Sequence, residues 1–268
     1  MSVGYNPFVS RVVFFIYLLE LIFSSFAWAA WDTSLEGSYR SFPLGGVAEW
    51  GLGYGQRVWG SDRGPFYGYV RVGAVVEGVE NYEAHAVSAE IFPLSFFGVK
   101  LGRRWVQNHN DYEDYDCVVY VCRGRFLEDF VEVPLYLSVG SILGVAVYRE
   151  SGWVSDGGND LGGKTDFIEP TSGLPLVALP RVESGSRIIR WRGGIFWQFP
   201  NGFRVGYTES TYRNREALSF MWLGVVQYRP TEHWSFTLSS GEYRSNLKLV
   251  DPTIYVSASY EPLLKLGY

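Results

Sequence analysis

The chain has 268 residues, enough for one large domain, and a formal net charge of -5 at neutral pH. This acidic balance disfavours nucleic acid as a partner, because nucleic-acid-binding domains usually carry a basic stripe or a high isoelectric point. Aromatic residues make up 18% of the sequence and glycine occurs 31 times, yet the mean hydropathy is only -0.01. This profile argues against long apolar blocks and favours alternation of apolar and polar residues.

The N-terminus has the composition of a secretory signal peptide. Arg11 precedes an apolar stretch over residues 12–26, and a small-residue pattern ends at Ala29. We expect residues 1–29 to be removed after Ala29, which leaves residues 30–268 as the mature domain. The alternative is a membrane anchor that stays attached. An anchor would want about 20 unbroken apolar residues, and Glu20 interrupts this run.

Beyond this segment, apolar residues recur at every second position. In residues 66–78, Val70, Val72 and Val76 share one face, while Tyr69 and Arg71 occupy the other. A period of two predicts β-strands with one apolar and one polar face. In chain order, the predicted strands are residues 34–41, 47–59, 66–78, 84–92, 96–106, 131–139, 142–149, 188–199, 203–212, 218–229, 233–239 and 254–260.

These strands predict a membrane-embedded barrel. No later segment is long enough for a transmembrane helix, and a closed barrel is the other structure that satisfies the backbone hydrogen bonds within a bilayer. We therefore expect an all-β fold, a transmembrane antiparallel up-and-down β-barrel of roughly 10–12 strands that begins at residues 34–41 or at residues 47–59. The architectural alternative is a soluble secreted β-sandwich, which would bury the valine and tryptophan faces between two sheets.

Connections of two lengths join the predicted strands. Tight reversals are expected at residues 93–95, 140–141, 200–202 and 230–231. Long connections are expected at residues 108–116, 151–185 and 244–252. Because outer-membrane barrels have short periplasmic turns and longer external loops, the long connections predict the external side. The longest of them is either a functional or interaction loop or a tolerated surface insertion.

The signal peptide, the period-two strands and the aromatic residues near strand ends together resemble the outer-membrane β-barrel class. The chain also ends with Tyr268 after Leu264 and Leu266, which looks like the terminal signal read by the barrel-assembly machinery. The resemblance covers essentially the whole mature chain. It implies a location in a bacterial outer membrane, with outer-membrane lipid and the assembly machinery as partners. A class of this breadth implies no particular activity.

The polar face of the strands supplies the candidates for charge inside the barrel. Seven bases and four acids have this parity: Arg57, Arg71, Lys100, Arg104, Arg190, Arg192, Arg204, Glu49, Glu77, Glu90 and Glu132. The excess of cations predicts a narrow pore with a mild preference for anions, because a ring of Arg or Lys lowers the barrier for negative solutes. The alternative is that these charges pair and fill the interior, since polar groups inside a small barrel need partners.

Cys117 and Cys122 are the only cysteines. In an extended strand they would lie about 16 Å apart on opposite faces, too far apart to bond. Export favours disulfides, so we expect a small disulfide ring made by a turn at residues 118–121, with the next strand starting near Arg125. The alternative is a metal site, which lacks the CxxC spacing and has only His109 nearby as a third ligand.

A possible catalytic pair completes the list of candidates. His233 and Ser235 share one strand face, with Glu242 downstream on the opposite face. At two positions they resemble the His and Ser pair of lipid A deacylase barrels, and such pairs are recognised by their hydrogen-bond geometry. The sequence has no phosphate-binding loop, nucleophile elbow or convincing metal signature. No cofactor is implied.

Three classes of function follow. A narrow pore for a small solute predicts conductance that falls when Arg190 and Arg192 are replaced. A structural or surface-interaction barrel predicts loss of binding when residues 151–185 are shortened. A lipid-modifying hydrolase predicts a change in lipid chemistry that disappears in Ser235→Ala.

Overall fold

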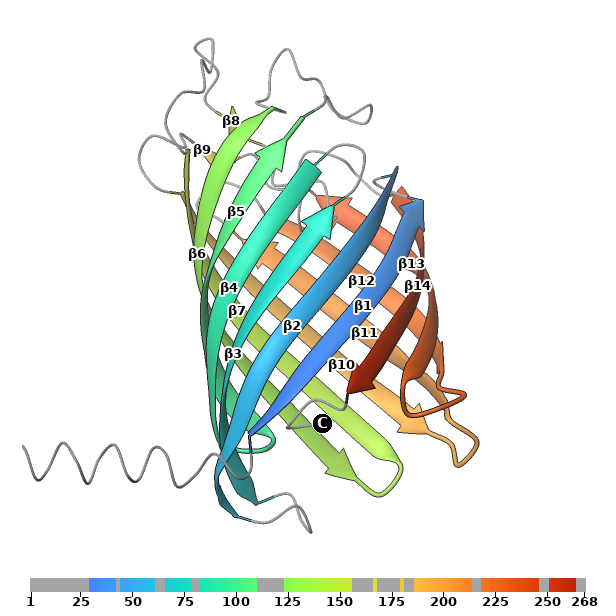
Figure 1. Ribbon diagram of the computed structural model, residues 1–268. Helices are drawn as coiled ribbons and strands as arrows, with labels where there is room; N and C mark the ends of the chain where they lie inside the picture. Colours follow the sequence, from blue (N-terminus) through green and yellow to red (C-terminus); the bar gives the residue numbers. More distant parts are fainter. Residues whose placement is uncertain are drawn as a thin grey trace, which may run out of the picture.

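The structure is a computed structural model, and it describes residues 29–41, 44–60, 66–78, 82–109, 123–155, 166–167, 179–180, 186–213, 218–245 and 251–263. In this part of the chain, twelve long strands close into one antiparallel barrel (Figure 1). The barrel strands are β1 (Ala29–Ser41), β2 (Leu44–Gly60), β3 (Tyr67–Gly78), β4 (Tyr82–Leu94), β5 (Phe97–Asn108), β6 (Gly124–Val139), β7 (Ile142–Ser155), β10 (Ser186–Gln198), β11 (Phe203–Arg213), β12 (Leu218–Tyr228), β13 (Trp234–Ser245) and β14 (Asp251–Leu263).

Each barrel strand pairs with the neighbours that precede and follow it, and β1 closes the barrel by pairing with β14. The predicted fold, an up-and-down barrel of about twelve strands, is confirmed. Both segments considered for the first strand, residues 34–41 and 47–59, form strands, namely β1 and β2. The signal-peptide segment up to residue 28 lies outside the described residues, so its cleavage stays a prediction.

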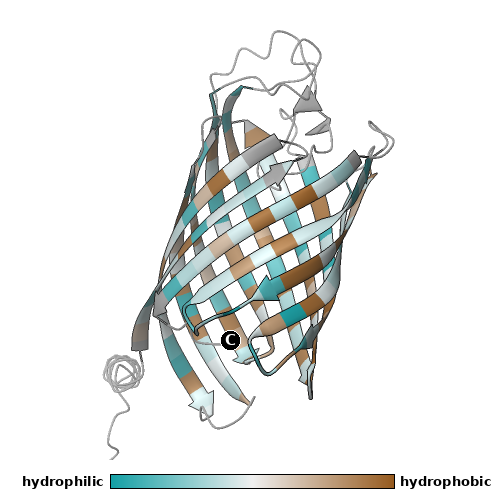
Figure 2. Ribbon diagram, turned by 90° about the vertical axis from the view of Figure 1, so that its right-hand side faces the viewer, coloured by the Kyte–Doolittle hydropathy of each residue, from teal (hydrophilic) through white to brown (hydrophobic). Residues whose placement is uncertain are grey.

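Alternation along each strand separates the two faces of the barrel wall, and Figure 2 shows hydrophobic and hydrophilic residues following one another along the strands. Large apolar side chains such as Trp191, Ile195 and Leu238 are more than half exposed on the outside. An exposed apolar surface of this extent suits contact with lipid. The sandwich alternative is wrong, because the sheet closes on itself and turns its apolar face outward.

No helix in the described part of the chain is long and apolar enough to cross a membrane.

The two ends of the barrel differ in their connections (Figure 1). Tight turns join β4 to β5, β6 to β7 and β10 to β11 at the end where β1 begins and β14 ends. Gly140 and Gly202 lie in two of these turns with φ of 58° and 83°, a left-handed conformation that glycine adopts without steric cost. The two longest connections, from β5 to β6 and from β7 to β10, lie at the opposite end, which corresponds to the external side of outer-membrane barrels.

Several strands run further than the sequence predicts. β6 and β7 pair as far as Phe126 with Ser155, so the predicted connection 151–185 begins later. β13 and β14 pair as far as Tyr243 with Asp251, which shortens the predicted connection 244–252, and β4 continues to Leu94 through the predicted reversal 93–95. The reason is that backbone pairing needs no alternation of side chains, so a strand can continue past the stretch in which the period of two is clear.

The long connection between β7 and β10 contains two strands that the sequence did not predict. β8 (Asp166–Phe167) and β9 (Leu179–Pro180) form a separate two-stranded sheet. Strands of two residues are too short to show any alternation, so no sequence period could indicate them.

The sidedness of β13 gives a direct test of lipid exposure. Leu238→Arg places a charge on the outer face, whereas Thr237→Arg, one residue earlier, places it in the lumen. We expect Leu238→Arg to lower the free energy of unfolding by about 2–4 kcal/mol, the cost of arginine facing hydrocarbon near the bilayer midplane. Urea titration of the refolded barrel in lipid vesicles measures the loss. Equal losses in the two variants would contradict the assignment of faces.

Candidate functional site

The inner wall carries a first chain of ion pairs near the closing strands. Arg71 on β3 donates from Nε and Nη2 to the Asp32 carboxylate on β1 at 2.7 and 2.6 Å, and from Nη1 to Glu90 on β4 at 2.9 Å. Lys100 Nζ on β5 lies 3.2 Å from the same Glu90. All four side chains are largely removed from water. Pairing is what makes such burial of charge tolerable.

Glycine makes the reach of Arg71 possible. β2 separates β1 from β3, and Gly53 is the β2 residue opposite both Asp32 and Gly73. A Cβ on Gly53 would lie 2.6 Å from the Arg71 Cζ atom, well inside van der Waals contact. The guanidinium therefore passes over a glycine to bond an acid two strands away.

A second chain of ion pairs crosses β3 to β10. Arg104 on β5 bonds Glu77 on β3 and lies 3.8 Å from Glu128 on β6. Glu128 is 2% exposed, and accepts from Arg149 Nη2 at 2.6 Å and from Ser151 Oγ at 2.6 Å.

The second chain continues to β10 through a shared acid. Glu132 lies 3.6 Å from Arg149 Nη1 and accepts from Arg190 Nη2 at 3.2 Å. The Arg149 guanidinium also stacks over the Phe130 ring at 3.9 Å, which adds a cation–π contact. Phe130 in turn occupies the space over Gly102, where a Cβ would lie 2.6 Å from the ring atom Cε1. One half of the wall is therefore cross-linked by charge.

The other half of the wall is mainly neutral. Hydroxyl side chains from β11 and β13 point inward, among them Thr208, Ser210, Thr237 and Ser239. Lower on the same side, Ser235 Oγ bonds Ser259 Oγ at 2.8 Å. Short hydroxyl side chains fill less of the lumen than arginine and glutamate pairs do, so this half leaves room inside the barrel.

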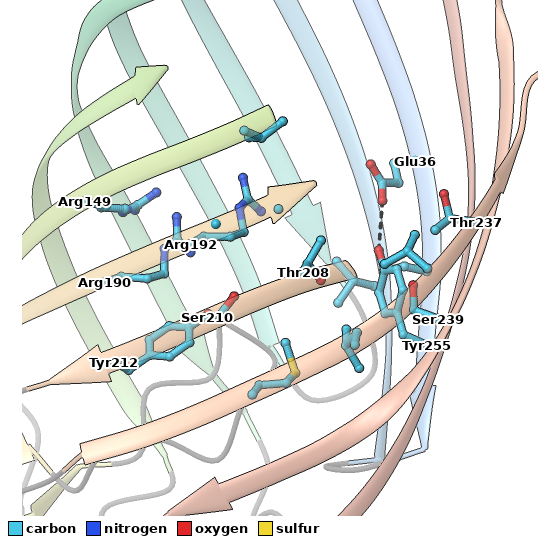
Figure 3. A pocket seen from close by; sticks show the side chains of 18 of the residues that line it. Glu36, Arg149, Arg190, Arg192, Thr208, Ser210, Tyr212, Thr237, Ser239 and Tyr255 are labelled. Atoms are coloured by element: carbon cyan, nitrogen blue, oxygen red, sulfur yellow. Dashed lines mark hydrogen bonds between the residues drawn. The ribbon is translucent and has the colours of Figure 1, made fainter. Parts of the chain in front are cut away.

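A cavity of about 560 Å³ occupies that room. In Figure 3, Arg149, Arg190 and Arg192 lie on one side of it, and Glu36, Thr237, Ser239 and Tyr255 lie on the other. Arg190 and Arg192 belong to β10, whereas Glu49, another lining residue, belongs to β2. β2 and β10 are opposite in the closed strand order, with five strands between them on either path. The cavity therefore has a basic wall that faces an acidic one.

Arg192 differs from the other lining arginines. Its neighbours in the ladders are Val147 on β7 and Ser210 on β11, neither of which carries a charge. Within the described residues no carboxylate pairs with Arg192, and its side chain is exposed to the cavity. By contrast, Glu36 accepts a hydrogen bond from Tyr255 Oη at 3.1 Å and is half-buried. Among the charged side chains that line the cavity, Arg192 is thus the one most accessible to a solute.

The structure places the remaining candidates on the inner wall as well. Arg57 lies over the Tyr67 ring at 5.3 Å, and Arg204 Nη1 donates to Gln227 at 3.3 Å. The strand pairings give the same inward side to the whole set of Arg57, Arg71, Lys100, Arg104, Arg190, Arg192, Arg204, Glu49, Glu77, Glu90 and Glu132.

Among the side chains that the structure describes, the sequence interpretation missed four charged residues of this wall. Asp32 lies before the start predicted for its strand, and Glu128 lies between the expected strand start near Arg125 and the alternating stretch 131–139. Glu36 and Arg149 lie inside predicted strands and have inward parity. With them, inward acids and bases are nearly equal in number, so the excess of cations is much smaller than the predicted strands suggested. Extending the alternation toward the strand ends would have found Asp32 and Glu128, and applying the inward parity to the whole of each predicted strand would have found Glu36 and Arg149.

The candidate catalytic residues bond to other groups. His233 Nδ1 lies 2.8 Å from the Glu261 carbonyl oxygen, and Ser235 bonds Ser259. Glu242 bonds Arg244 on the outer face. In the described contacts these three side chains do not meet one another. Cys117 and Cys122 lie outside the described residues, so the disulfide stays a prediction.

A closed antiparallel wall that is apolar outside and charged inside decides the class. The chain is a β-barrel of the outer-membrane class. No family model matches it, and no curated protein matches it. One similar solved structure is the KdgM porin in complex with disordered oligogalacturonate, with 9% sequence identity over 85% of this chain and 98% of that chain and a TM-score of 0.46. Another is the NanC porin, with 14% identity over 85% of this chain and 98% of that chain and a TM-score of 0.44. A third is the beta domain of the Bordetella autotransporter BrkA, with 10% identity over 87% of this chain and 98% of that chain and a TM-score of 0.37. At such values we take no function from these proteins.

The second chain of ion pairs predicts a site of high energetic sensitivity. Glu128→Gln keeps the shape of the side chain but leaves Arg104 and Arg149 without their shared acid. We expect the free energy of unfolding to fall by about 3–5 kcal/mol, the range for removing one partner of a buried pair. Urea titration followed by tryptophan fluorescence measures the change.

The neighbouring residue supplies the control for this test. Asp129→Asn breaks an exposed ion pair with Arg103 on the outside of the same strand, and exposed pairs contribute little to stability. A loss in Asp129→Asn as large as that in Glu128→Gln would count against the inner chain of ion pairs as a stabilising element.

Proposed function

We propose that this barrel is a narrow pore in a bacterial outer membrane, with a mild preference for small anionic solutes. The observation that carries the proposal is the 560 Å³ cavity, onto which Arg192 opens without an ion-pair partner in the described residues. A cation in this position lowers the electrostatic barrier for a passing anion.

The size of the barrel supports a narrow path. Twelve strands lie between the eight of barrels that side chains fill and the sixteen to eighteen of porins with a wide aqueous channel. In this wall the chains of ion pairs are concentrated on β3 to β7, with their ends at Asp32 on β1 and Arg190 on β10, and the hydroxyl residues of β11 and β13 border the space. The proposed path is therefore eccentric and runs past the hydroxyl side.

The opposed charges across the cavity support selection of a solute by the orientation of its charged groups as well as by the sign of its charge. Arg190 and Arg192 lie across the cavity from Glu36 and Glu49. A solute crossing this region meets a field directed across the pore, which attracts its negative groups to β10. Because Glu36 is half-buried and engaged by Tyr255, the basic side dominates. A mild preference for anions follows.

Single-channel recording in planar bilayers tests the pore. We expect the refolded mature chain to show steady conductance with an anion-to-cation permeability ratio above one. Arg192→Gln should lower that ratio on the order of twofold and Arg192→Glu should invert it, because the charge at the cavity is removed or reversed. Arg192→Gln breaks no ion pair in the described residues, so the fold should be kept.

Arg244→Gln is the matched control, since Arg244 lies on the outside of β13 and bonds Glu242 there. It should leave both conductance and selectivity unchanged. A well-folded but silent wild-type barrel would overturn the pore, and a permeability ratio that Arg192→Glu does not change would overturn the role of Arg192.

A further inference from the structure

The outer face carries charged side chains beyond a run of apolar residues, on the side of the long connections. On β6 the outward side chains from the tight turn upward are Leu137, Leu135, Val133 and Val131, and the next is Asp129. On β10 the outward series of Trp197, Ile195, Trp191 and Ile189 ends in the same way at Arg187. We take these charges, with the outward Trp105 next to Arg103 on β5, to mark the change from hydrocarbon to headgroups in a surrounding bilayer.

Four of these residues form two ion pairs, which we call the outer quartet: Arg103, Asp129, Glu150 and Arg187. Arg103 donates from Nε and Nη2 to the two Asp129 oxygens at 2.6 and 2.9 Å. Arg187 bonds Glu150, which also accepts from Tyr148 Oη at 2.8 Å. The pairings Arg103–Asp129–Gly152–Arg187 place the quartet along one line across β5, β6, β7 and β10.

A groove of about 450 Å³ is lined by three quartet residues, Asp129, Glu150 and Arg187, and by the apolar side chains of Leu101, Val131 and Val154. It adjoins a second, almost wholly apolar groove of about 630 Å³ on β1 to β5, which Arg103 also lines, and both grooves share Leu101 and Gly102. The second groove exists because small residues, Ala74 and Ala89 among them, stand between larger side chains. Charge at one end and an apolar channel at the other match an amphipathic lipid.

We propose that the outer quartet binds the phosphate groups of lipopolysaccharide, with acyl chains lying in the adjoining apolar groove. A guanidinium has five N–H donors. Asp129 uses two donors of Arg103, which leaves the others for a phosphate, and arginine is the residue best suited to that ligand. The acids hold each guanidinium in a fixed position, so less side-chain freedom is lost when the lipid binds.

The distribution of outward arginines favours an anionic headgroup in this sector. Arg103, Arg125, Arg187 and Arg213 are exposed on strands β5 to β11, and Arg244 on β13 is the remaining outward arginine of the described strands. Basic residues at the headgroup level are the usual recognition element for anionic lipids. Lipopolysaccharide is the phosphate source we choose, because the quartet lies on the side of the long connections. The proposal rests on the outer-membrane location but not on conduction.

Lipid binding to the refolded barrel tests this site. Wild type is titrated in detergent micelles with purified lipopolysaccharide, and bound lipid phosphate per folded barrel is measured after gel filtration. We expect Arg103→Gln/Arg187→Gln to weaken binding about tenfold, since two guanidinium–phosphate contacts are lost. Arg244→Gln is the matched control, an exposed outward arginine with its own acid partner, and it should bind as wild type does.

A second variant separates the arrangement of the site from net charge. Arg103→Gln/Asp129→Asn/Glu150→Gln/Arg187→Gln keeps the formal charge of the chain and also avoids leaving unpaired acids at the surface. We expect it to lose binding as well. Equal binding by wild type and both quartet variants would overturn the proposal, and so would equally tight binding of phosphatidylglycerol by wild type.

The two proposals fail in different ways. In planar bilayers both quartet variants should keep the conductance and selectivity of wild type, because the quartet lies outside the barrel wall. A silent wild-type barrel that still binds lipopolysaccharide through the quartet would reject the pore alone. A conducting barrel whose lipid binding is indifferent to the quartet would reject the lipid site alone.

Discussion

The whole structure depends on the need to satisfy backbone hydrogen bonds where no water is available. A sheet inside a bilayer must close, and here β1 closes it against β14. At this closure Thr33 pairs with Leu263 but Leu35 pairs with Tyr260, so β14 contains an extra residue and Pro262 falls in the irregular stretch. Proline has no N–H to offer a ladder, and an irregularity is where its absence costs least. Once the sheet is closed, every second side chain can face only lipid or lumen.

Closure also brings charged side chains into a confined interior, where each needs a partner. Different strands of the wall meet that need in different ways. From β3 to β7 the partners are other charges, linked through shared acids such as Glu90 and Glu128, whereas β11 and β13 use small hydroxyl side chains. The first solution cross-links several strands and fills volume, and the second leaves volume empty. The position of the cavity is therefore a consequence of how charge is distributed among the strands.

Sequence periodicity was sufficient to predict the fold. A period of two over a dozen segments indicates strands, and no segment after residues 12–26 is long enough for a transmembrane helix, which leaves a closed barrel as the membrane-spanning structure. It also indicates which side chains share a face. It could not identify partners inside the barrel. Arg71 bonds Asp32 across an intervening strand, and only the three-dimensional register and the missing side chain of Gly53 make that contact possible. Parity likewise could not show that Arg190 shares Glu132 while Arg192, two residues on, has uncharged neighbours.

Consecutive residues on β5 and β6 form two ion pairs on opposite faces of the barrel wall. Arg104 and Glu128 meet inside the barrel, while Arg103 and Asp129 meet outside it. The inner contact is nearly excluded from water and belongs to a longer chain of ion pairs, so its removal leaves buried charges behind. Both side chains of the outer pair are about half exposed, and an exposed ion pair contributes little to stability. Stability therefore accounts for the inner pair but not for the outer one, which is better explained by the proposed contact with charged headgroups.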